Sequence, residues 1–427
     1  MITARAFAGK KYAVYGLARS GLGTAAALIA SGAEVAAWDA KEEARAKACA
    51  GVRIENLDEV DLKPFDSLVV TPGLPLNRHP IAKRAREAGV EIIGDIELFA
   101  RARTELPPHK VVGITGTNGK STTTALVHHI LKTAGVPTEM GGNIGLPILA
   151  QDPLPESGVY VLELSSYQID LTKSLDCDVA VLLNITPDHL DRYESFEAYG
   201  ASKFRLFKMQ SKHHASVIAD PGLREIWVDK MDGPDQLSTQ RPIADWGRYQ
   251  SDWPALQGPH NAQNVGAAIA VCAELGVASD VVLSALQTYP GLPHRMERVR
   301  VKDGVLFVND SKATNPTATA PALGAFDRIC WIVGGQAKTD NLDECARYFG
   351  HVASAYTIGE AGELFARLLS SRMSVKNCGK LDEAVRQAAA DARPGDTVLL
   401  SPACASFDQF RDFEDRGDQF RALVGAL

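Results

Sequence analysis

The sequence predicts an α/β protein with three domains, each built on a mostly parallel sheet. Three observations favour this fold class. The chain has 427 residues, well beyond the roughly 250–300 residues at which a single hydrophobic core stops growing. Its content of 45% apolar and 23% charged residues is that of a globular protein. Short apolar runs alternate with helical segments, as in sheets whose parallel strands are joined by helices.

The first predicted domain covers residues 1–94 and resembles a Rossmann-like nucleotide-binding domain. Its predicted strands lie at residues 12–15, 33–39 and 67–70. Gly16 and Gly21 lead from the first strand into an alanine-rich helix, and Asp39 ends the second strand, where an acid that binds ribose is expected. The glycine motif is incomplete because Ala18 replaces its second glycine. The remaining glycines and Asp39 still make NAD one candidate ligand. The alternative is a sheet with tight turns that binds no ligand.

The second predicted domain, residues 95–297, contains the strongest motif. A strand at 111–114 leads into Thr115–Thr122 and then into a helix. Two glycines let backbone N–H groups converge on one point, where a phosphate can bind, and the helix N-terminus adds positive potential there. Lys120 can reach a terminal phosphate, and Ser121 can bind Mg²⁺. The loop is a short variant, because Ile114 stands where the common motif has its first glycine. We predict a P-loop-type ATP-binding domain; the alternative is a strand-to-helix turn with an incidental lysine.

Polar clusters follow two further predicted strands of this domain, at 159–162 and 179–183. The first cluster begins at Glu163, and the second contains Asp188 and His189. Because ligands bind at the carboxyl ends of parallel strands, we expect Glu163, His189 and Ser121 to supply Mg²⁺ ligands. A capping role for Asp188 and a structural role for His189 are the alternatives.

A helix that begins near residue 260 carries Asn261 and Asn264 on one side, where paired amides could recognise adenine. The polar stretch from about 220 to 259 has weak periodicity, and we expect irregular or edge structure there. The third predicted domain, residues 298–427, is again Rossmann-like. Its predicted strands lie near 305–309, 329–333, 355–358 and 397–400.

Charge and cysteine content limit the partners. Lys and Arg number 45 against 52 Asp and Glu, a net charge of −7, which disfavours binding to nucleic acid or anionic membranes. The seven cysteines are widely scattered and form no CxxC motif, as in a reduced cytosolic chain. No apolar stretch approaches about 18 residues, and the N-terminus lacks the features of a signal peptide. We expect a cytoplasmic protein without nucleic-acid or membrane partners.

Several of these motifs together resemble the Mur ligase family of ATP-dependent amide-forming enzymes. The motifs are Thr115–Ser121, Glu163–Gln168, the His260-Asn261-x-x-Asn264 helix start and His294-Arg295. The resemblance extends over essentially the whole chain. Within the family, the runs Asn309–Pro316 and Leu400–Phe410 are similar to those of members that join D-glutamate to UDP-N-acetylmuramoyl-L-alanine.

The resemblance implies a reaction that uses ATP and two Mg²⁺ ions, passes through an acyl phosphate and releases ADP and phosphate in cytoplasmic peptidoglycan precursor synthesis. It implies that Ser121 and Glu163 hold one metal, that His189 holds the second, and that Asn143 lies near the γ-phosphate. Lys203 matches a family lysine that is carbamylated and serves as an acidic partner of the metal site. Lys120, Lys203, His189 and Lys312 are the implied catalytic residues.

The resemblance also implies the remaining contacts. ATP would be bound by Gly116, Thr117, Asn118, Gly119, Lys120, Ser121, Thr122, Asn143, Asn261, Asn264, Arg295 and Asp310, with Arg295 at a hinge and Asp310 at the ribose. D-Glutamate would contact Thr314, Lys338, Ser406 and Phe413. UDP, rather than NAD, would occupy the first domain and contact Ala18, Arg19, Ser20, Asp39, Lys41 and Gly73. We expect a monomer.

Four alternatives remain. A sister ligase that adds another amino acid and a folylpolyglutamate synthase are close ones, and the run Asn309–Pro316 speaks against both. A nicotinamide-dependent dehydrogenase would leave Lys120, Glu163, His189 and Lys312 without a role. A non-catalytic nucleotide-binding switch predicts ATP binding without phosphate release that depends on an amino acid.

Overall fold

The computed structural model describes residues 1–188, 191–223, 238–239, 246 and 248–427. His189 and most of the polar stretch from about 220 to 259 lie outside them. The chain forms two compact units, one of Met1–Arg241 with Gly266–Ala285 and one of Pro242–Val265 with Leu286–Leu427. The boundaries proposed above at 94/95 and 297/298 stay predictions.

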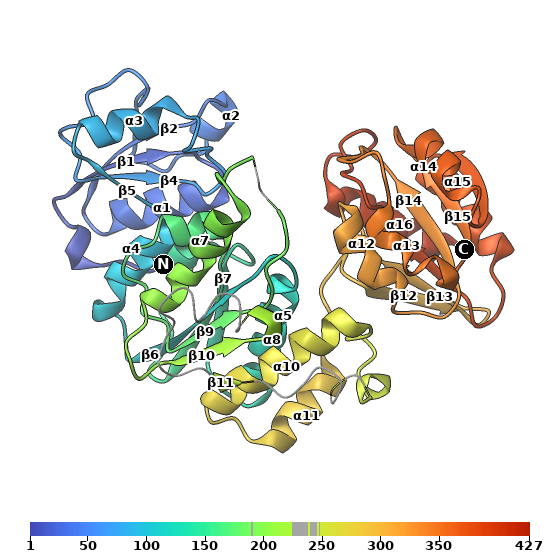
Figure 1. The fold of residues 1–427 in the computed structure, drawn as a ribbon. Coiled ribbons are helices and arrows are strands. Elements are labelled where there is room, and N and C mark those ends of the chain that lie inside the picture. Colours follow the sequence, from blue (N-terminus) through green and yellow to red (C-terminus); the bar gives the residue numbers. More distant parts are fainter. Residues whose placement is uncertain (189–190, 224–237, 240–245, 247) are drawn as a thin grey trace. The chain divides into compact units, whose positions relative to one another are not determined.

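The first sheet has five parallel strands in the order β3-β2-β1-β4-β5. Its strands are β1 (Lys11–Tyr15), β2 (Glu34–Trp38), β3 (Arg53–Ile54), β4 (Ser67–Val70) and β5 (Glu91–Ile93). The accompanying helices are α1 (Arg19–Ala30), α2 (Glu42–Arg45), α3 (Pro80–Glu87) and α4 (Asp95–Ala102). Alternate residues of β1 point to opposite faces of the sheet. Tyr12 and Val14 belong to a hydrophobic core with residues of α1, whereas Ala13 and Tyr15 belong to a core with residues of α3. The two helices therefore cover opposite faces of the sheet (Figure 1).

The second sheet has six parallel strands in the order β11-β10-β9-β6-β8-β7. They are β6 (His109–Thr115), β7 (Thr138–Gly142), β8 (Gly158–Glu163), β9 (Val179–Leu182), β10 (Ala215–Ile218) and β11 (Ser238–Thr239). The helices that follow them are α5 (Lys120–Thr133), α6 (Ser166–Asp170), α7 (Phe196–Lys208), α8 (Pro221–Leu223), α10 (Pro259–Glu274) and α11 (Ser279–Thr288). Every residue of β8 and β9 is buried, as expected of central parallel strands.

The third sheet has the order β12-β13-β17-β14-β15-β16, and only β12 is antiparallel to its neighbour. Its strands are β12 (Glu297–Lys302), β13 (Val305–Asn309), β14 (Ile329–Gly334), β15 (Val352–Ile358), β16 (Ser374–Gly379) and β17 (Thr397–Leu400). Two layers of helices cover it: α12 (Pro316–Leu323), α13 (Asp343–Ala346) and α14 (Gly362–Leu369) on one face, α15 (Leu381–Asp391) and α16 (Phe413–Ala426) on the other. The predicted fold class, α/β with three mostly parallel sheets, is confirmed.

Two glycines, one directly after β1 and one in α1, are required by close contacts there. A Cβ at Gly21 would overlap the carbonyl oxygen of Gly16, and a Cβ at Gly16, whose φ is +96°, would overlap the side chain of Thr71. Because both positions lack a side chain, the start of α1 can pack in close contact with the end of β1.

Replacing Gly21 with alanine is expected to destabilise the protein by about 1–3 kcal/mol, because the new methyl group must displace backbone. Gly23→Ala on the same helix is the matched control. Its Cβ would lie 3.3 Å from Ala150 and Pro147 side chains, and the gain in helix propensity, up to about 1 kcal/mol, offsets this crowding. Thermal unfolding of both variants checks the difference; equal midpoints would contradict the packing argument.

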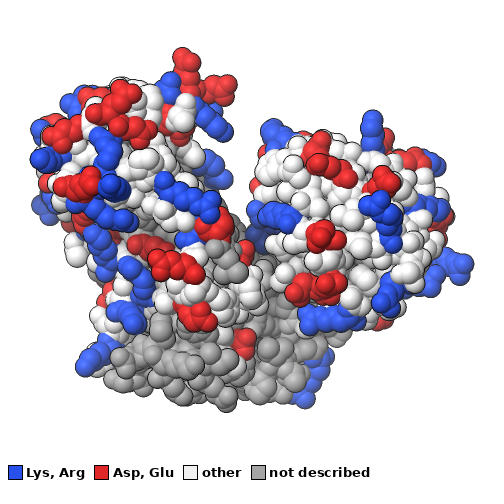
Figure 2. Space-filling model, turned by 45° about the horizontal axis from the view of Figure 1, so that its top comes forward, with Lys and Arg blue, Asp and Glu red and all other residues white. Residues whose placement is uncertain are grey.

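The surface carries charges of both signs. Figure 2 shows basic and acidic side chains interspersed over the described part of the face that it draws. Within the described ranges, no helix combines the length and apolar character needed to cross a lipid bilayer.

Candidate active site

The phosphate loop connects β6 to α5. Gly116 and Gly119 have φ angles of +149° and +85°, which glycine adopts without strain. Lys120 begins α5 and folds its side chain back over the loop, so that Nζ donates to the carbonyl oxygens of Gly116 at 2.9 Å and Thr117 at 2.8 Å. The predicted strand, glycine loop and helix are therefore present in that order, with the lysine ammonium held at the loop.

Asn184, the second residue after β9, holds this loop in place. Its carbonyl oxygen accepts from Thr117 N at 2.9 Å, its Oδ1 accepts from Asn118 N at 2.9 Å, and its Nδ2 donates to Asn118 O at 3.2 Å. The hydroxyl of Thr117 adds bonds to Thr186 and Tyr199. The sequence predicts a polar cluster at this strand end but does not single out Asn184. Its position as the first polar residue after the strand was the available signal.

Glu163 ends β8, beside β6, with which it is in register at Ile114. Its side chain is 2% exposed; Oε1 accepts from Asn143 Nδ2 at 2.9 Å, while Oε2 has no hydrogen-bond partner among the described residues. A buried carboxylate oxygen without a donor is costly unless a cation satisfies it. Glu163 thus has the chemistry of a Mg²⁺ ligand, and Asn143, predicted near the γ-phosphate, lies against it.

Lys203 lies on α7, with its side chain only 1% exposed. Its Nζ donates to Gly116 O at 3.0 Å, the same oxygen that accepts from Lys120, and lies 4.5 Å from the centre of the Tyr199 ring. Burial, followed by repulsion from Lys120, lowers the pKa of the Lys203 amine well below its ordinary value. Two predicted catalytic lysines therefore converge on one carbonyl group of the phosphate loop.

The other predicted metal ligands are placed in part. Ser121 is buried in the first turn of α5, whereas His189 lies outside the described residues. The described residues contain no group of three or more His, Cys, Asp and Glu side chains able to hold a metal. The fit for Mg²⁺ consequently rests on Glu163, Ser121 and the strand-end geometry.

Asn261 and Asn264 face the same side of α10, as predicted from their spacing. Asn264 Nδ2 donates to Asn261 Oδ1 at 3.0 Å, and Asn261 Nδ2 donates to Gln257 O at 2.9 Å. Both side chains are buried. Their neighbour His260 is half-buried with its Nδ1 enclosed, and desolvation lowers its pKa to about 4, so its imidazole is neutral.

In the unit built on the third sheet, predicted ligands come together at the carboxyl ends of β13, β14 and β17. Gln336, next to the loop of Lys338, pairs with Ala405, next to Ser406, through two backbone hydrogen bonds. Lys312 Nζ lies 3.6 Å from the centre of the Phe413 ring. Ser406 is buried, Thr314 and Phe413 are half-buried, and Lys338 is exposed.

Arg416 connects these loops by hydrogen bonds, a role that no motif in the sequence indicates. Its fully buried guanidinium donates to Ser311 Oγ and to the carbonyl oxygens of Ser311, Cys404 and Ala405. Burial lowers its pKa to about 10, so it stays charged at neutral pH. An interior cation satisfied by carbonyl dipoles contributes positive potential beside the predicted D-glutamate residues.

Arg295 precedes β12 and Asp310 directly follows β13. Asp310 Oδ1 accepts from Met296 N at 3.1 Å and Oδ2 accepts from Ser401 Oγ at 2.8 Å. Burial raises the pKa of Asp310 to about 7. Arg295 stands between His294 and Met296, two residues with left-handed φ angles of +61° and +49°. Such backbone is found where a chain changes direction, as at the hinge predicted there.

The predicted UDP contacts gather at the start of α1 and the ends of β2 and β4. Ala18 caps α1 without a side-chain bond, so the N–H groups of Arg19 and Ser20 lie in an uncapped first turn. Asp39 already accepts from Leu17 N at 2.7 Å and Lys41 N at 2.9 Å. These two bonds give Asp39 a structural role beside the predicted one. Arg19 donates to Gly145 O at 2.6 Å. Lys41 and Gly73 are exposed.

This chain is similar to known proteins over its whole length. The family profile described as the Mur ligase middle domain matches residues 114–236, and that described as the Mur ligase glutamate ligase domain matches residues 294–404. A UDP-N-acetylmuramoylalanine–D-glutamate ligase of Novosphingobium aromaticivorans is 60% identical, over 100% of this chain and 97% of its own. The enzyme of that name from Sphingopyxis alaskensis is 57% identical over 100% of both chains.

Solved structures share the fold. The MurF ligase of Thermotoga maritima in complex with ADP has a TM-score of 0.61 at 18% identity, covering 99% of this chain and 97% of its own. The fold, the phosphate loop and the full-length relatives make this chain an enzyme of the ligase class. It belongs to the Mur ligase family.

Proposed function

We propose that this enzyme joins the amine of D-glutamate to the carboxylate of UDP-N-acetylmuramoyl-L-alanine, with ATP converted to ADP and phosphate, in cytoplasmic peptidoglycan precursor synthesis. The observation that carries the proposal is the full-length identity of 60% and 57% to relatives that bear the name of this activity. The runs Asn309–Pro316 and Leu400–Phe410 support the same choice of amino acid.

The reaction has two steps. The substrate carboxylate attacks the γ-phosphorus of ATP, so that an acyl phosphate forms and ADP leaves. The amine of D-glutamate then attacks the acyl carbon, the amine proton is lost, and phosphate leaves as the amide forms. Lys120 and the backbone N–H groups of residues 116–122 bind and orient the phosphates, and Asn143 lies beside the γ-phosphate.

Two Mg²⁺ ions would supply charge neutralisation at the transferring phosphoryl group. We assign one to Ser121 and Glu163, for which the orphaned Oε2 of Glu163 speaks, and the second to His189. Asn261 and Asn264 would bind adenine, Asp310 the ribose and Arg295 the hinge side of the nucleotide. Lys312 would lie by the transferring phosphate.

Lys203 is assigned as a carbamate. Its neutral amine adds to CO₂, a proton leaves, and the product is an anion that can hold a metal ligand in place. Burial and the nearby cation Lys120 lower the amine pKa and so favour the reactive neutral amine, and the same cation favours the anionic product. The convergence of Lys120 and Lys203 on Gly116 O supports this assignment.

Substrate contacts follow the same logic. D-Glutamate has two carboxylates, which need fixed donors, and Thr314, Lys338 and Ser406 can supply them beside Phe413. The uncapped turn at Ala18, Arg19 and Ser20 suits a diphosphate, with Asp39 and Lys41 near uracil and Gly73 near the sugar-linked end. We propose that the enzyme acts as a monomer.

Phosphate release tests the substrate assignment. With ATP, Mg²⁺ and UDP-N-acetylmuramoyl-L-alanine, we expect release with D-glutamate and background release with L-glutamate, L-lysine or diaminopimelate. Omission of the UDP-linked substrate is the control. Equal release with all four amino acids would contradict the roles of Thr314, Lys338 and Ser406, and release with diaminopimelate alone would indicate a sister ligase.

A further inference from the structure

One arginine joins the two parts of the first unit that the proposed function assigns to the UDP-linked substrate and to Mg²⁺. Arg192 Nη2 donates to Leu74 O at 2.8 Å and Nη1 to Gly73 O at 3.4 Å. The same guanidinium lies 4.3 Å from the centre of the Tyr167 ring. Gly73 and Leu74 follow β4 of the first sheet, whereas Tyr167 is on α6, four residues after Glu163.

The backbone beside Arg192 strengthens this connection. Asp191 O accepts from Asn77 Nδ2 at 3.1 Å and from Arg78 Nη2 at 2.9 Å. Donors from the turn after β4 therefore bind the segment of Arg192, and Arg192 binds that turn in return. Four hydrogen bonds link the two short segments.

Helix α6, which carries Tyr167, is fixed by hydrogen bonds and ring stacking of its own. Ser165 and Gln168 form a capping box at the start of α6, which fixes the helix close behind Glu163. Tyr167 stacks on Tyr193 with 6.0 Å between ring centres, and Tyr193 OH donates to Asp170 at 2.8 Å. A displacement of Tyr167 would consequently be transmitted to the strand end that carries Glu163.

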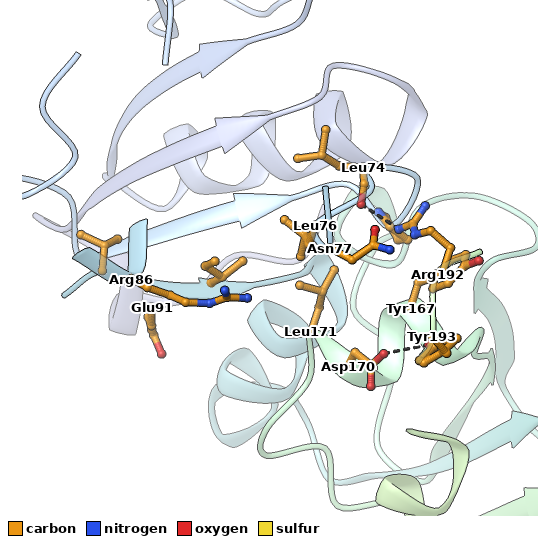
Figure 3. A pocket seen from close by; sticks show the side chains of 13 residues that line it. Leu74, Leu76, Asn77, Arg86, Glu91, Tyr167, Asp170, Leu171, Arg192 and Tyr193 are labelled. Atoms are coloured by element: carbon orange, nitrogen blue, oxygen red, sulfur yellow. Dashed lines mark hydrogen bonds between the residues drawn. The ribbon is translucent and has the colours of Figure 1, made fainter. Parts of the chain in front are cut away.

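A cavity of about 490 Å³ adjoins this contact. Leu74, Leu76, Asn77, Tyr167, Arg192 and Tyr193 line it together with residues of α3 and β5, and Figure 3 shows the Arg192 side chain reaching toward Leu74 beside Tyr167. Because open space lies on one side of the 72–77 turn, packing restrains that turn less than it restrains a core segment. Leu74 and Leu76 of the turn pack against the core of the first sheet, and the bonds from Arg192 add two polar contacts that hold it.

We propose that Arg192 is a positioning residue that couples binding of the UDP-linked substrate at the Gly73 turn to Mg²⁺ binding at Glu163. The inference rests on the proposed function. A planar guanidinium donates to two successive carbonyl groups through separate nitrogens while its flat face stacks on a tyrosine, a geometry that a lysine ammonium, as a compact point charge, does not reproduce. Coupling between two sites is reciprocal, so each ligand raises the affinity for the other by one factor, commonly about 5–150-fold.

The test measures that factor by calorimetry. With a non-hydrolysable ATP analogue present throughout, the dissociation constant of UDP-N-acetylmuramoyl-L-alanine is determined with and without saturating Mg²⁺ for the wild type, Arg192→Ala and Arg192→Lys. We expect at least about a fivefold effect of Mg²⁺ in the wild type and nearly none in either variant. Arg86→Ala is the matched control, an exposed arginine of α3 that lines the same cavity; it should retain the wild-type factor.

Turnover supplies a second readout. Arg192→Ala should raise both the KM for the UDP-linked substrate and the Mg²⁺ concentration at half-maximal rate, and leave the KM for D-glutamate unchanged. An unaltered Mg²⁺ effect in the Arg192 variants, or a uniform loss that includes D-glutamate, would overturn the coupling. A wild-type enzyme that releases no phosphate with D-glutamate would instead refute the proposed function, and the calorimetric comparison would still decide on Arg192.

Discussion

Replacing Lys120 with alanine should lower kcat by about 10³-fold, the order of effect seen when one preorganised cation or donor at a transferring phosphoryl group is lost. The structure gives two reasons. The ammonium of Lys120 lies directly at the loop, and its bonds to the carbonyl oxygens of Gly116 and Thr117 also set the loop conformation. The KM for ATP should rise as well, since the substrate triphosphate and the transition state share this contact.

The matched control for Lys120 is on the same helix. Lys132 is an exposed lysine in the last turn of α5, and Lys132→Ala should keep wild-type kcat. Steady-state phosphate release at saturating substrates, together with circular dichroism to verify folding, checks both variants. A folded Lys120→Ala enzyme with normal turnover would remove the phosphate loop from the mechanism.

Replacing Lys203 with arginine should lower kcat by at least about 10²-fold, the lower range for loss of a positioned acid or base. Arginine keeps a positive charge but cannot become a neutral amine at accessible pH, so it forms no carbamate. It would also place a permanent second cation beside Lys120 in a buried site. The loss of the carbamate and the added buried cation should both lower kcat.

A labelling experiment separates the two causes. With ¹³C-bicarbonate, the wild type should give a carbamate signal in the ¹³C NMR spectrum and Lys203→Arg should not. Lys208→Arg, at an exposed position of α7, is the control and should keep both signal and activity. A fully active Lys203→Arg enzyme, or a wild type without a carbamate signal under turnover conditions, would exclude carbamylation as part of the mechanism.

Buried strands could be predicted from the sequence, whereas edge strands could not. The strands β6, β8, β9, β13, β14 and β17 are short apolar runs bounded by turn residues, and each lies close to its predicted position. The edge strand β16 is mostly exposed and its residues Ser374–Gly379 show little apolar character. The edge strand β12 pairs in the antiparallel direction with β13. Such strands are set by pairing with a neighbour, which leaves only a weak local pattern.

The candidate site divides in the same way. The phosphate loop and Glu163 follow buried strands directly and were therefore predictable by position. Asn184, Arg416 and Arg192 act by bonding to backbone groups far away in sequence. Arg416 and Arg192 have no spacing or neighbour that marks this role in the chain, and Asn184 is marked only by its place as the first polar residue after its strand.

The amino-acid sequence indicates the α/β class, the succession of the buried strands along the chain and the chemical groups that follow those strands, because apolar periodicity and glycine spacing are local properties. Only the tertiary structure decided which of these groups meet. Lys120 and Lys203 share Gly116 O although they are far apart in the chain, and Glu163 has one oxygen left without a donor. These relations depend on strand order and burial, which are fixed by packing across the whole sheet rather than by any one segment.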